Sequence, residues 1–168
     1  VAGESAERVL DPRNAFLMAS LMRDVVRSGT AVRAMSLGRQ DLAGKTGTTN
    51  DHIDAWVAGF QATHVAVAWI GFDTPAPMGA NETGGFAALP MWITYMGRVL
   101  NGEPESDPEP PEGIVAVAID PATGMREADG RSKTIEYFYR ESLPGSGGEG
   151  GAGRDAARPP EEVKNQIF

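Results

Sequence analysis

The sequence contains no cysteine, so disulfide bonds are excluded and the redox compartment of the protein is not indicated. It contains two histidines, His52 and His64, which are too few and too far apart for a standard zinc site. The polar segment 51–54 around the first of them is interpreted as a turn between strands, and we expect neither a metal nor a cofactor. No run of about 18 consecutive apolar residues occurs, so no segment is expected to span a membrane.

Positive charge is also scarce. The chain has 15 Lys and Arg residues against 23 Asp and Glu residues, which gives a net charge of −8. Nucleic-acid binding needs clustered cations, so we expect no nucleic-acid partner. The length of 168 residues and the hydrophobic fraction of 41% are typical of a globular protein with one modest core.

The most informative segment is Lys45-Thr46-Gly47-Thr48-Thr49, which has the composition of a short strand with a cation at its start and a glycine in its middle. Side chains alternate along a strand, so the hydroxyls of Thr46 and Thr48 share one face and can hold a substrate carboxylate. Gly47 lets a ligand lie against the backbone like an added strand. The N–H of Thr48 can point at a developing oxyanion. The Lys45 stem leaves on the opposite face and must curl round the strand edge to bring its ammonium into the site.

The same residues allow two other interpretations. A phosphate-binding loop of the form G-x-x-x-x-G-K-[ST] needs four residues between its glycines, whereas five separate Gly38 from Gly44. Such a loop must also enter a helix, and residues 47–51 are poor helix formers. The other alternative is a purely structural strand with a solvated lysine.

The flanking sequence favours the catalytic interpretation. Five blocks carry a resemblance: Asp11–Phe16, Arg23–Ala31, Leu42–Asn50, Asp54–Phe60 and Val67–Asp73. From Asp11 to about Gly102 the chain resembles the C-terminal part of the transpeptidase domain of class A (bifunctional) penicillin-binding proteins. The lysine-threonine-glycine motif accompanies S-x-x-K and S-x-N motifs in such enzymes.

The resemblance implies a reaction and roles for the motif. Such domains cross-link peptidoglycan: a serine attacks the D-Ala-D-Ala end of one stem peptide, and an amine of a second stem peptide resolves the acyl-enzyme. β-Lactam antibiotics stall the enzyme at the acyl stage. We predict that Lys45 and the Thr48 N–H are catalytic groups, and that Thr46, Gly47, Thr48 and Thr49 bind substrate.

The nucleophile is missing from this sequence. No serine lies in an S-x-x-K pattern, the nearest being Ser20 with Arg23 in place of the lysine, and no S-x-N occurs. Arginine does not act as a base at ordinary pH. We therefore expect a C-terminal fragment that is inactive alone and docks to the remainder of the transpeptidase domain, with stem peptides and β-lactams as its ligands. A β-lactamase, a D-alanyl carboxypeptidase and a non-catalytic β-lactam-sensing or scaffold relative remain as alternatives.

The expected fold is α/β: a partial serine-transpeptidase or β-lactamase-like fold with an antiparallel sheet flanked by helices. Hydrophobic periodicity and turn residues predict helices, strands and loops. The helices are 12–27, begun by Asp11 and stopped by Gly29, and 90–100; the strands are 44–49, 55–60, 65–72, 114–119 and 134–140; residues 31–41 and 75–85 are loops.

Four segments are expected along the chain. They are residues 1–102 as the C-terminal part of the transpeptidase domain, 103–112 as an acidic proline-rich linker, 113–143 as a small β appendage, and 144–168 as a disordered low-complexity tail. The resemblance implies a location on the periplasmic side of the bacterial inner membrane. The anchor and a glycosyltransferase domain would lie upstream.

Overall fold

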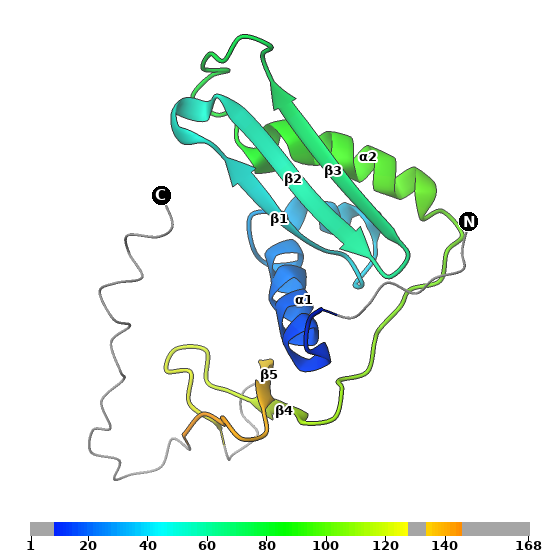
Figure 1. The fold of residues 1–168 in the computed structure, drawn as a ribbon, viewed down its shortest axis with the longest axis vertical. Helices are drawn as coiled ribbons and strands as arrows, with labels where there is room; N and C mark the ends of the chain where they lie inside the picture. The colour runs from blue at the N-terminus through cyan, green and yellow to red at the C-terminus, as the bar shows by residue number, and fades with distance from the viewer. Residues whose placement is uncertain (1–8, 128–133, 146–168) are drawn as a thin grey trace. The chain divides into compact units, whose positions relative to one another are not determined.

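A computed structural model describes residues 9–127 and 134–145 of the chain (Figure 1). Its elements are α1 (Pro12–Arg27), the 3-10 helix η1 (Val32–Leu37), β1 (Ala43–Thr48), the 3-10 turn η2 (Asn50–His52), β2 (Asp54–Gln61), β3 (His64–Gly71), the π-helical turn η3 (Gly84–Ala88), α2 (Leu89–Val99), β4 (Ile114–Ala118) and β5 (Ile135–Tyr139). By internal contacts the chain divides into two compact units, one of residues 1–116 and 137–143 and one of residues 117–136 and 144–168. Within the described ranges, no helix is both long and apolar enough to cross a bilayer.

The first unit is built on a three-stranded antiparallel sheet in the order β1-β2-β3. Two residues link β2 to β3, and Gln61 pairs with His64 across that link. The register places Gly47 opposite Trp56, and Trp56 opposite Trp69, in one row across the sheet. The predicted antiparallel meander is therefore confirmed, with strand ends within one or two residues of those expected.

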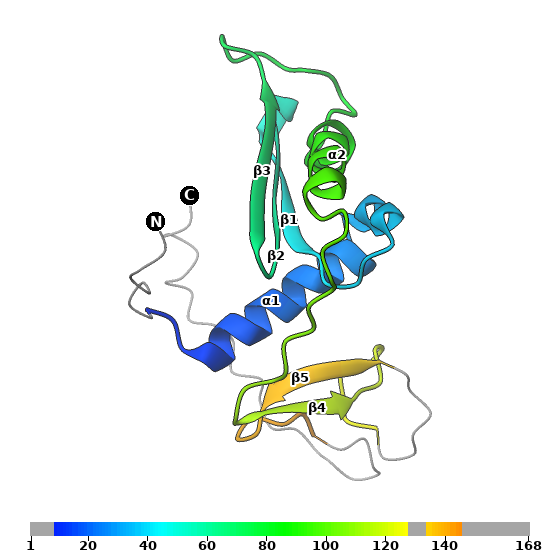
Figure 2. The same ribbon diagram turned by 90° about the vertical axis from the view of Figure 1, so that its right-hand side faces the viewer.

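Helix α2 covers one face of this sheet, as Figure 2 shows edge-on. Alternate residues of β2, including Ala55 and Val57, are buried on that face against Trp92 and Met96 of α2. The helix expected over residues 90–100 is confirmed, shifted by one residue at each end. Figure 2 shows no helix against the opposite face within the described part of this unit.

Helix α1 begins and ends where the sequence predicts. The Asp11 carboxylate caps it by accepting from the N–H of Arg13 at 2.8 Å. Gly29 follows the C-cap, but its φ is not positive; a Cβ there would lie 2.9 Å from the Cα of Val25. Gly29 is thus required by close backbone approach and not by a left-handed conformation.

The apolar side chains of α1 are only partly buried. Val26 is buried, whereas Met18 and Leu21 are 49% and 56% exposed. The buried positions also include Ser20 and Arg23. The aliphatic stem of an arginine can pack in a core while its charged end reaches outward. Here the guanidinium of Arg23 lies 3.6 Å from the carboxylate of Asp107.

Two predicted loops contain helical turns. Helix η1 occupies most of 31–41, and η3 begins at Gly84, inside the predicted loop 75–85 and before Pro90. A Cβ at Gly84 would lie 2.5 Å from the carbonyl oxygen of Gly47 and closer still to that of Trp56. The turn can therefore form only because a glycine lets it sit directly on the strand backbones.

The acidic segment after α2 has no helix or strand between Gly102 and Gly113, within the described residues, but its first residues are fastened to the core. The Arg39 guanidinium donates to the carbonyl of Glu103 at 2.7 Å, and the Asp41 carboxylate accepts from the N–H of Ser106 at 3.0 Å. The start of the predicted linker is thus held in place by an ion pair.

Strands β4 and β5 form a two-stranded sheet, which confirms the pairing of the two strands expected in 114–119 and 134–140. The separate appendage of residues 113–143 stays a prediction. A turn follows β4, in which Asp120 accepts from the N–H of Ala122 at 2.9 Å and Gly124 has a φ of 68°. The predicted disorder of residues 144–168 falls, from residue 146 on, outside the described residues.

Candidate active site

The free edge of β1 is the centre of the candidate site. Within the described residues, β1 pairs on one side only, with β2. In an antiparallel pair the N–H and C=O groups of alternate residues point toward the partner strand. Thr49 donates its N–H to the carbonyl of Asp54 at 3.1 Å, so the backbone groups of Lys45 and Gly47 also point toward β2. The N–H and C=O groups of Thr46 and Thr48 therefore point to the free edge.

Lys45 places its ammonium at this edge. Its Nζ donates to the carbonyl oxygen of Thr46 at 2.6 Å. The lysine stem leaves the strand on the face opposite to α2, because Lys45 is exposed while Thr46 is buried toward the helices. The stem then curls round the edge, which brings a positive charge beside the outward backbone groups.

The two threonine hydroxyls lie on the other face, beneath the helical layer. The Oγ1 of Thr46 lies 2.6 Å from the Oγ1 of Thr30, and Thr46 is only 9% exposed. The Oγ1 of Thr48 accepts from the N–H of Gly84 at 3.0 Å. Thr48 therefore keeps its own hydroxyl proton free to donate to a ligand.

Two glycines make this arrangement possible. Gly47 leaves bare backbone between the two threonines, and a Cβ there would lie 3.3 Å from the Cβ of Trp56. On the face that carries the helices, Gly84 packs directly against the backbone of Gly47 and Trp56. Sequence reasoning found Gly47 but missed Gly84 and Thr30. Neither Gly84 nor Thr30 has a local pattern that indicates its contact with a strand so distant in the sequence.

Thr49 has a different role in the structure. Its Oγ1 accepts from the N–H of Asp54 at 2.8 Å and so closes the β1–β2 connection. Within that connection Asp51 and His52 have φ values of 57° and 53°, which is the left-handed conformation of a tight turn. The predicted polar turn is confirmed, and the predicted substrate contact of Thr49 stays a prediction.

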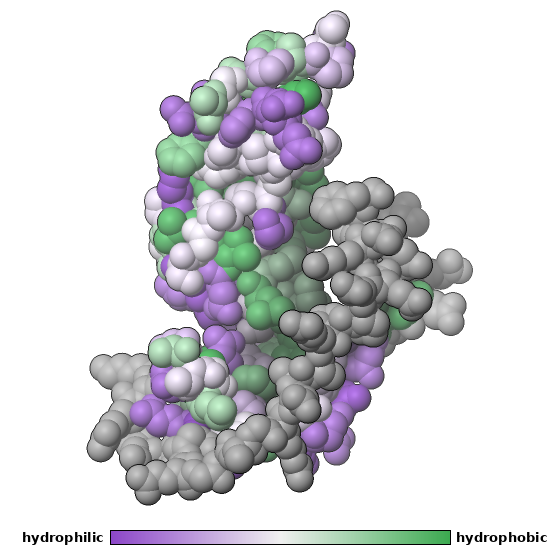
Figure 3. Space-filling view, turned by 90° about the vertical axis from the view of Figure 1, so that its left-hand side faces the viewer, coloured by the Kyte–Doolittle hydropathy of each residue, from purple (hydrophilic) through white to green (hydrophobic). Residues whose placement is uncertain are grey.

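The face of the sheet opposite to α2 is apolar. Beside the Lys45 stem, its exposed large hydrophobic side chains are Trp56, Trp69, Val65 and Val67. The two indole rings pack on each other with centroids 5.9 Å apart, and Trp69 donates its Nε1–H to the carboxylate of Asp54 at 2.9 Å. Figure 3 views the molecule from the side that carries β1 in Figure 1 and shows hydrophobic residues among polar ones.

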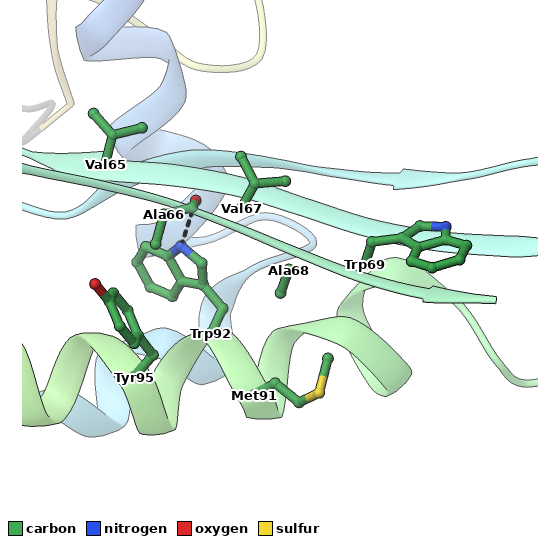
Figure 4. Close-up of a pocket in the computed structure, with 8 residues that line it drawn as sticks. All are labelled: Val65, Ala66, Val67, Ala68, Trp69, Met91, Trp92 and Tyr95. Carbon is green, nitrogen blue, oxygen red and sulfur yellow. Dashed lines mark hydrogen bonds between the residues drawn. The ribbon is translucent and has the colours of Figure 1, made fainter.

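A second apolar surface lies at the β3 edge. A hollow of about 490 Å³ is lined by Val65, Ala66, Val67, Ala68, Trp69, Met91, Trp92 and Tyr95. In Figure 4, Trp92 and Tyr95 rise from α2 toward β3, and the Nε1–H of Trp92 donates to the carbonyl of Ala66 at 3.1 Å. The lining carries no acid, base or cation, so this hollow suits apolar packing and not bond chemistry.

The chain is similar in sequence to penicillin-binding proteins 1A of several bacteria. The chain is 46% identical to penicillin-binding protein 1A of Pseudomonas aeruginosa over 142 residues, which are 84% of this chain and 17% of that protein. It is 50% identical to penicillin-binding protein 1A of Neisseria gonorrhoeae over 116 residues, which are 69% of this chain and 14% of that protein. The chain thus spans less than a fifth of the length of these relatives.

A solved structure of a penicillin-binding protein 1A also matches this chain. The crystal structure of penicillin-binding protein 1A from Haemophilus influenzae matches with a TM-score of 0.77 and 37% identity, over 84% of this chain and 22% of that one. No protein-family model matches the chain. The mixed α/β architecture expected from the sequence is therefore found in a structure whose sequence is also related.

Proposed function

Because the chain is homologous to a short part of class A penicillin-binding protein 1A, we propose that it forms the C-terminal part of a peptidoglycan D,D-transpeptidase domain. One observation carries the proposal: the free edge of β1 presents an outward Thr48 N–H and the Lys45 ammonium together. We call the longer protein that contains this chain the parent.

In this proposal the donor stem peptide lies along β1 as an added strand. Its carbonyl oxygen faces the N–H of Thr48, and the N–H of the nucleophile, supplied by another part of the parent, completes the oxyanion hole. One such donor lowers the barrier by roughly 3 kcal/mol. D-Ala leaves, and the amine of an acceptor stem peptide then takes the acyl group from the serine.

The side chains of β1 bind the anionic end of the donor. The hydroxyls of Thr46 and Thr48 donate to the terminal carboxylate, and Lys45 attracts that negative charge and relays protons near the serine. A β-lactam carboxylate occupies the same position. The helical-face location of both hydroxyls, close to η3, supports a carboxylate site between the β1 edge and that turn.

The partner of this chain is the remainder of the transpeptidase domain. It covers the apolar sheet face of Trp56, Trp69, Val65 and Val67, and it brings the S-x-x-K serine to the β1 edge. The parent holds this domain on the periplasmic side of the bacterial inner membrane through a segment upstream of these residues.

Fluorescent penicillin labelling of the parent tests the proposal. We expect Lys45→Ala and Thr48→Val to slow acylation at least tenfold, about 1.4 kcal/mol or more of barrier, because each removes one group that binds the anion. Thr48→Val also leaves the Gly84 N–H without its acceptor, so Thr48→Ser, which keeps the hydroxyl, is the matched control and should label nearly as fast as the parent. Acylation of both variants at the parental rate would contradict the assignment of the site.

A cross-linking assay with lipid-linked peptidoglycan precursors completes the test. A transpeptidase joins stem peptides and loses this activity when penicillin acylates it. A parent that is acylated but never cross-links would instead be a β-lactam sensor or scaffold.

A further inference from the structure

The hydroxyl of Thr30 is the nearest polar side-chain partner of the β1 motif from outside the strand. It lies 2.6 Å from the Oγ1 of Thr46, which places it at the short end of hydroxyl–hydroxyl hydrogen bonds. Thr30 is itself exposed, so burial of its side chain does not explain the contact. The motif strand thus has a polar partner 16 residues upstream.

The backbone around Thr30 is fixed from both sides. Before it, the N–H of Gly29 donates to the carbonyl of Asp24 at 3.1 Å, and after it the N–H of Ala31 donates to the carbonyl of Val25 at 3.0 Å. A Cβ at Gly85 would lie 2.8 Å from the carbonyl oxygen of Thr30. The end of α1 and the turn η3 therefore hold this threonine against β1.

The direction of the hydrogen bond decides what Thr46 can do for a ligand. Each hydroxyl has one proton to donate. If Thr46 donates to Thr30, its oxygen presents lone pairs alone to a carboxylate and repels it. If Thr30 donates to Thr46, the proton of Thr46 is free to donate to the carboxylate, and the two hydrogen bonds reinforce each other.

We propose that Thr30 is a positioning residue, whose hydroxyl donates to Thr46 and so turns the Thr46 proton toward the carboxylate of a stem peptide or β-lactam. The proposal rests on the function proposed above for the β1 edge and extends it to a residue outside the motif. Thr30 acts through Thr46 and does not itself touch the ligand.

The test compares a penicillin with its methyl ester, which has lost the anionic carboxylate, as acylating agents of the parent. We expect Thr30→Val, which keeps the shape and removes the hydroxyl, to lower the second-order acylation rate of the acid about fivefold, the effect of one lost hydrogen bond. The slower acylation by the ester should be unchanged. Thr30→Ser should restore the rate of the acid, and if Thr30→Val does not fold, Thr30→Ala provides the same comparison.

Three outcomes separate the possibilities. An equal loss of rate for acid and ester would mean that Thr30 only supports the fold, and would overturn the inference. Unchanged rates for both compounds would overturn it as well, while leaving the proposed function intact. A parent that no penicillin acylates, or whose Lys45→Ala variant acylates normally, would refute the proposed function and this inference with it.

Discussion

At the scale of single residues, the Asp41 carboxylate accepts four hydrogen bonds. Its side chain is 3% exposed and forms a two-pronged pair with Arg39, with N–O distances of 2.7 and 2.9 Å. It also accepts from Gln61 and from the N–H of Ser106, each at 3.0 Å. Burial alone would raise the pKa of Asp41, but these donors together outweigh it and hold the pKa below its ordinary value.

Asp41→Asn should therefore destabilise the protein at neutral pH by about 3 kcal/mol, because it removes the anion that neutralises the Arg39 charge, on a side chain that is only 11% exposed. The sign of the pH dependence follows from the lowered pKa of Asp41. The stabilisation is complete above the unfolded-state pKa and is lost as the pH falls through the lower folded-state pKa.

The check is the melting temperature of the parent and the variant, followed by tryptophan fluorescence from pH 7 downward. The difference in melting temperature between the parent and Asp41→Asn should be largest at neutral pH and should disappear below the ordinary aspartate pKa near 3.8. Asp107→Asn is the control, because the Asp107 side chain is 94% exposed and its replacement should leave the melting temperature nearly unchanged. A difference in melting temperature that does not change with pH would contradict the role of the Asp41 charge.

The sequence predicted the geometry of the β1 edge as far as local patterns allow, while the roles of its residues stay predictions. Alternation along a strand placed Thr46 and Thr48 on one face, and the length of the Lys45 stem predicted its path round the edge. The contacts of Thr30 and Gly84 depend on where α1 and η3 dock, which no local pattern encodes. For the same reason the local pattern of α1 did not predict that Ser20 and Arg23 are buried.

At the scale of elements, η3 determines how closely the connection before α2 approaches β1 and β2. Its first residue, Gly84, meets the strand backbones at distances that exclude any side chain. The same residue donates to the Thr48 hydroxyl, so the packing of the turn and the geometry of the site are linked. Helices and strands were predictable from periodicity, whereas this π-helical turn was not, because it depends on tertiary contact.

Gly84→Ala should destabilise the domain by about 1–3 kcal/mol, because the added methyl group pushes η3 away from the strands. The shift should also break the hydrogen bond to Thr48 and slow acylation by penicillin. Gly97→Ala in α2 is the matched control, because its Cβ would meet only a flexible methyl group of Leu37, at 2.9 Å. Melting temperature and labelling rate should both fall for Gly84→Ala and hold for Gly97→Ala; equal behaviour of the two variants would contradict the account of the turn.

At the scale of the whole molecule, the sheet is covered on one face and apolar on the other. Trp56 and Trp69 are each 43% exposed, and Val67 is 61% exposed. Contiguous apolar surface of this kind marks an interaction site, and in the function proposed above the remainder of the transpeptidase domain covers it. The sequence predicted a sheet that needs a partner, because three strands and two helices account for one side of the expected fold.

The substitution Val67→Lys, made both in the 168-residue chain and in the parent, tests whether this sheet face is covered. Val67→Lys should leave the stability of the 168-residue chain nearly unchanged, because the side chain is in water there. In the parent the same lysine would be buried without a partner, and the melting temperature of the transpeptidase domain should fall clearly. The same small effect in both proteins would show that this face stays uncovered.

In the proposed function, β1 supplies half of a reaction centre and a serine outside these residues supplies the attacking hydroxyl. A crystal structure of the parent acylated by a penicillin tests it most directly. We expect the β-lactam carbonyl oxygen within hydrogen-bond distance of the Thr48 N–H, and the carboxylate within that distance of the Thr46 and Thr48 hydroxyls. An acylated serine whose adduct makes no contact with β1 would contradict it.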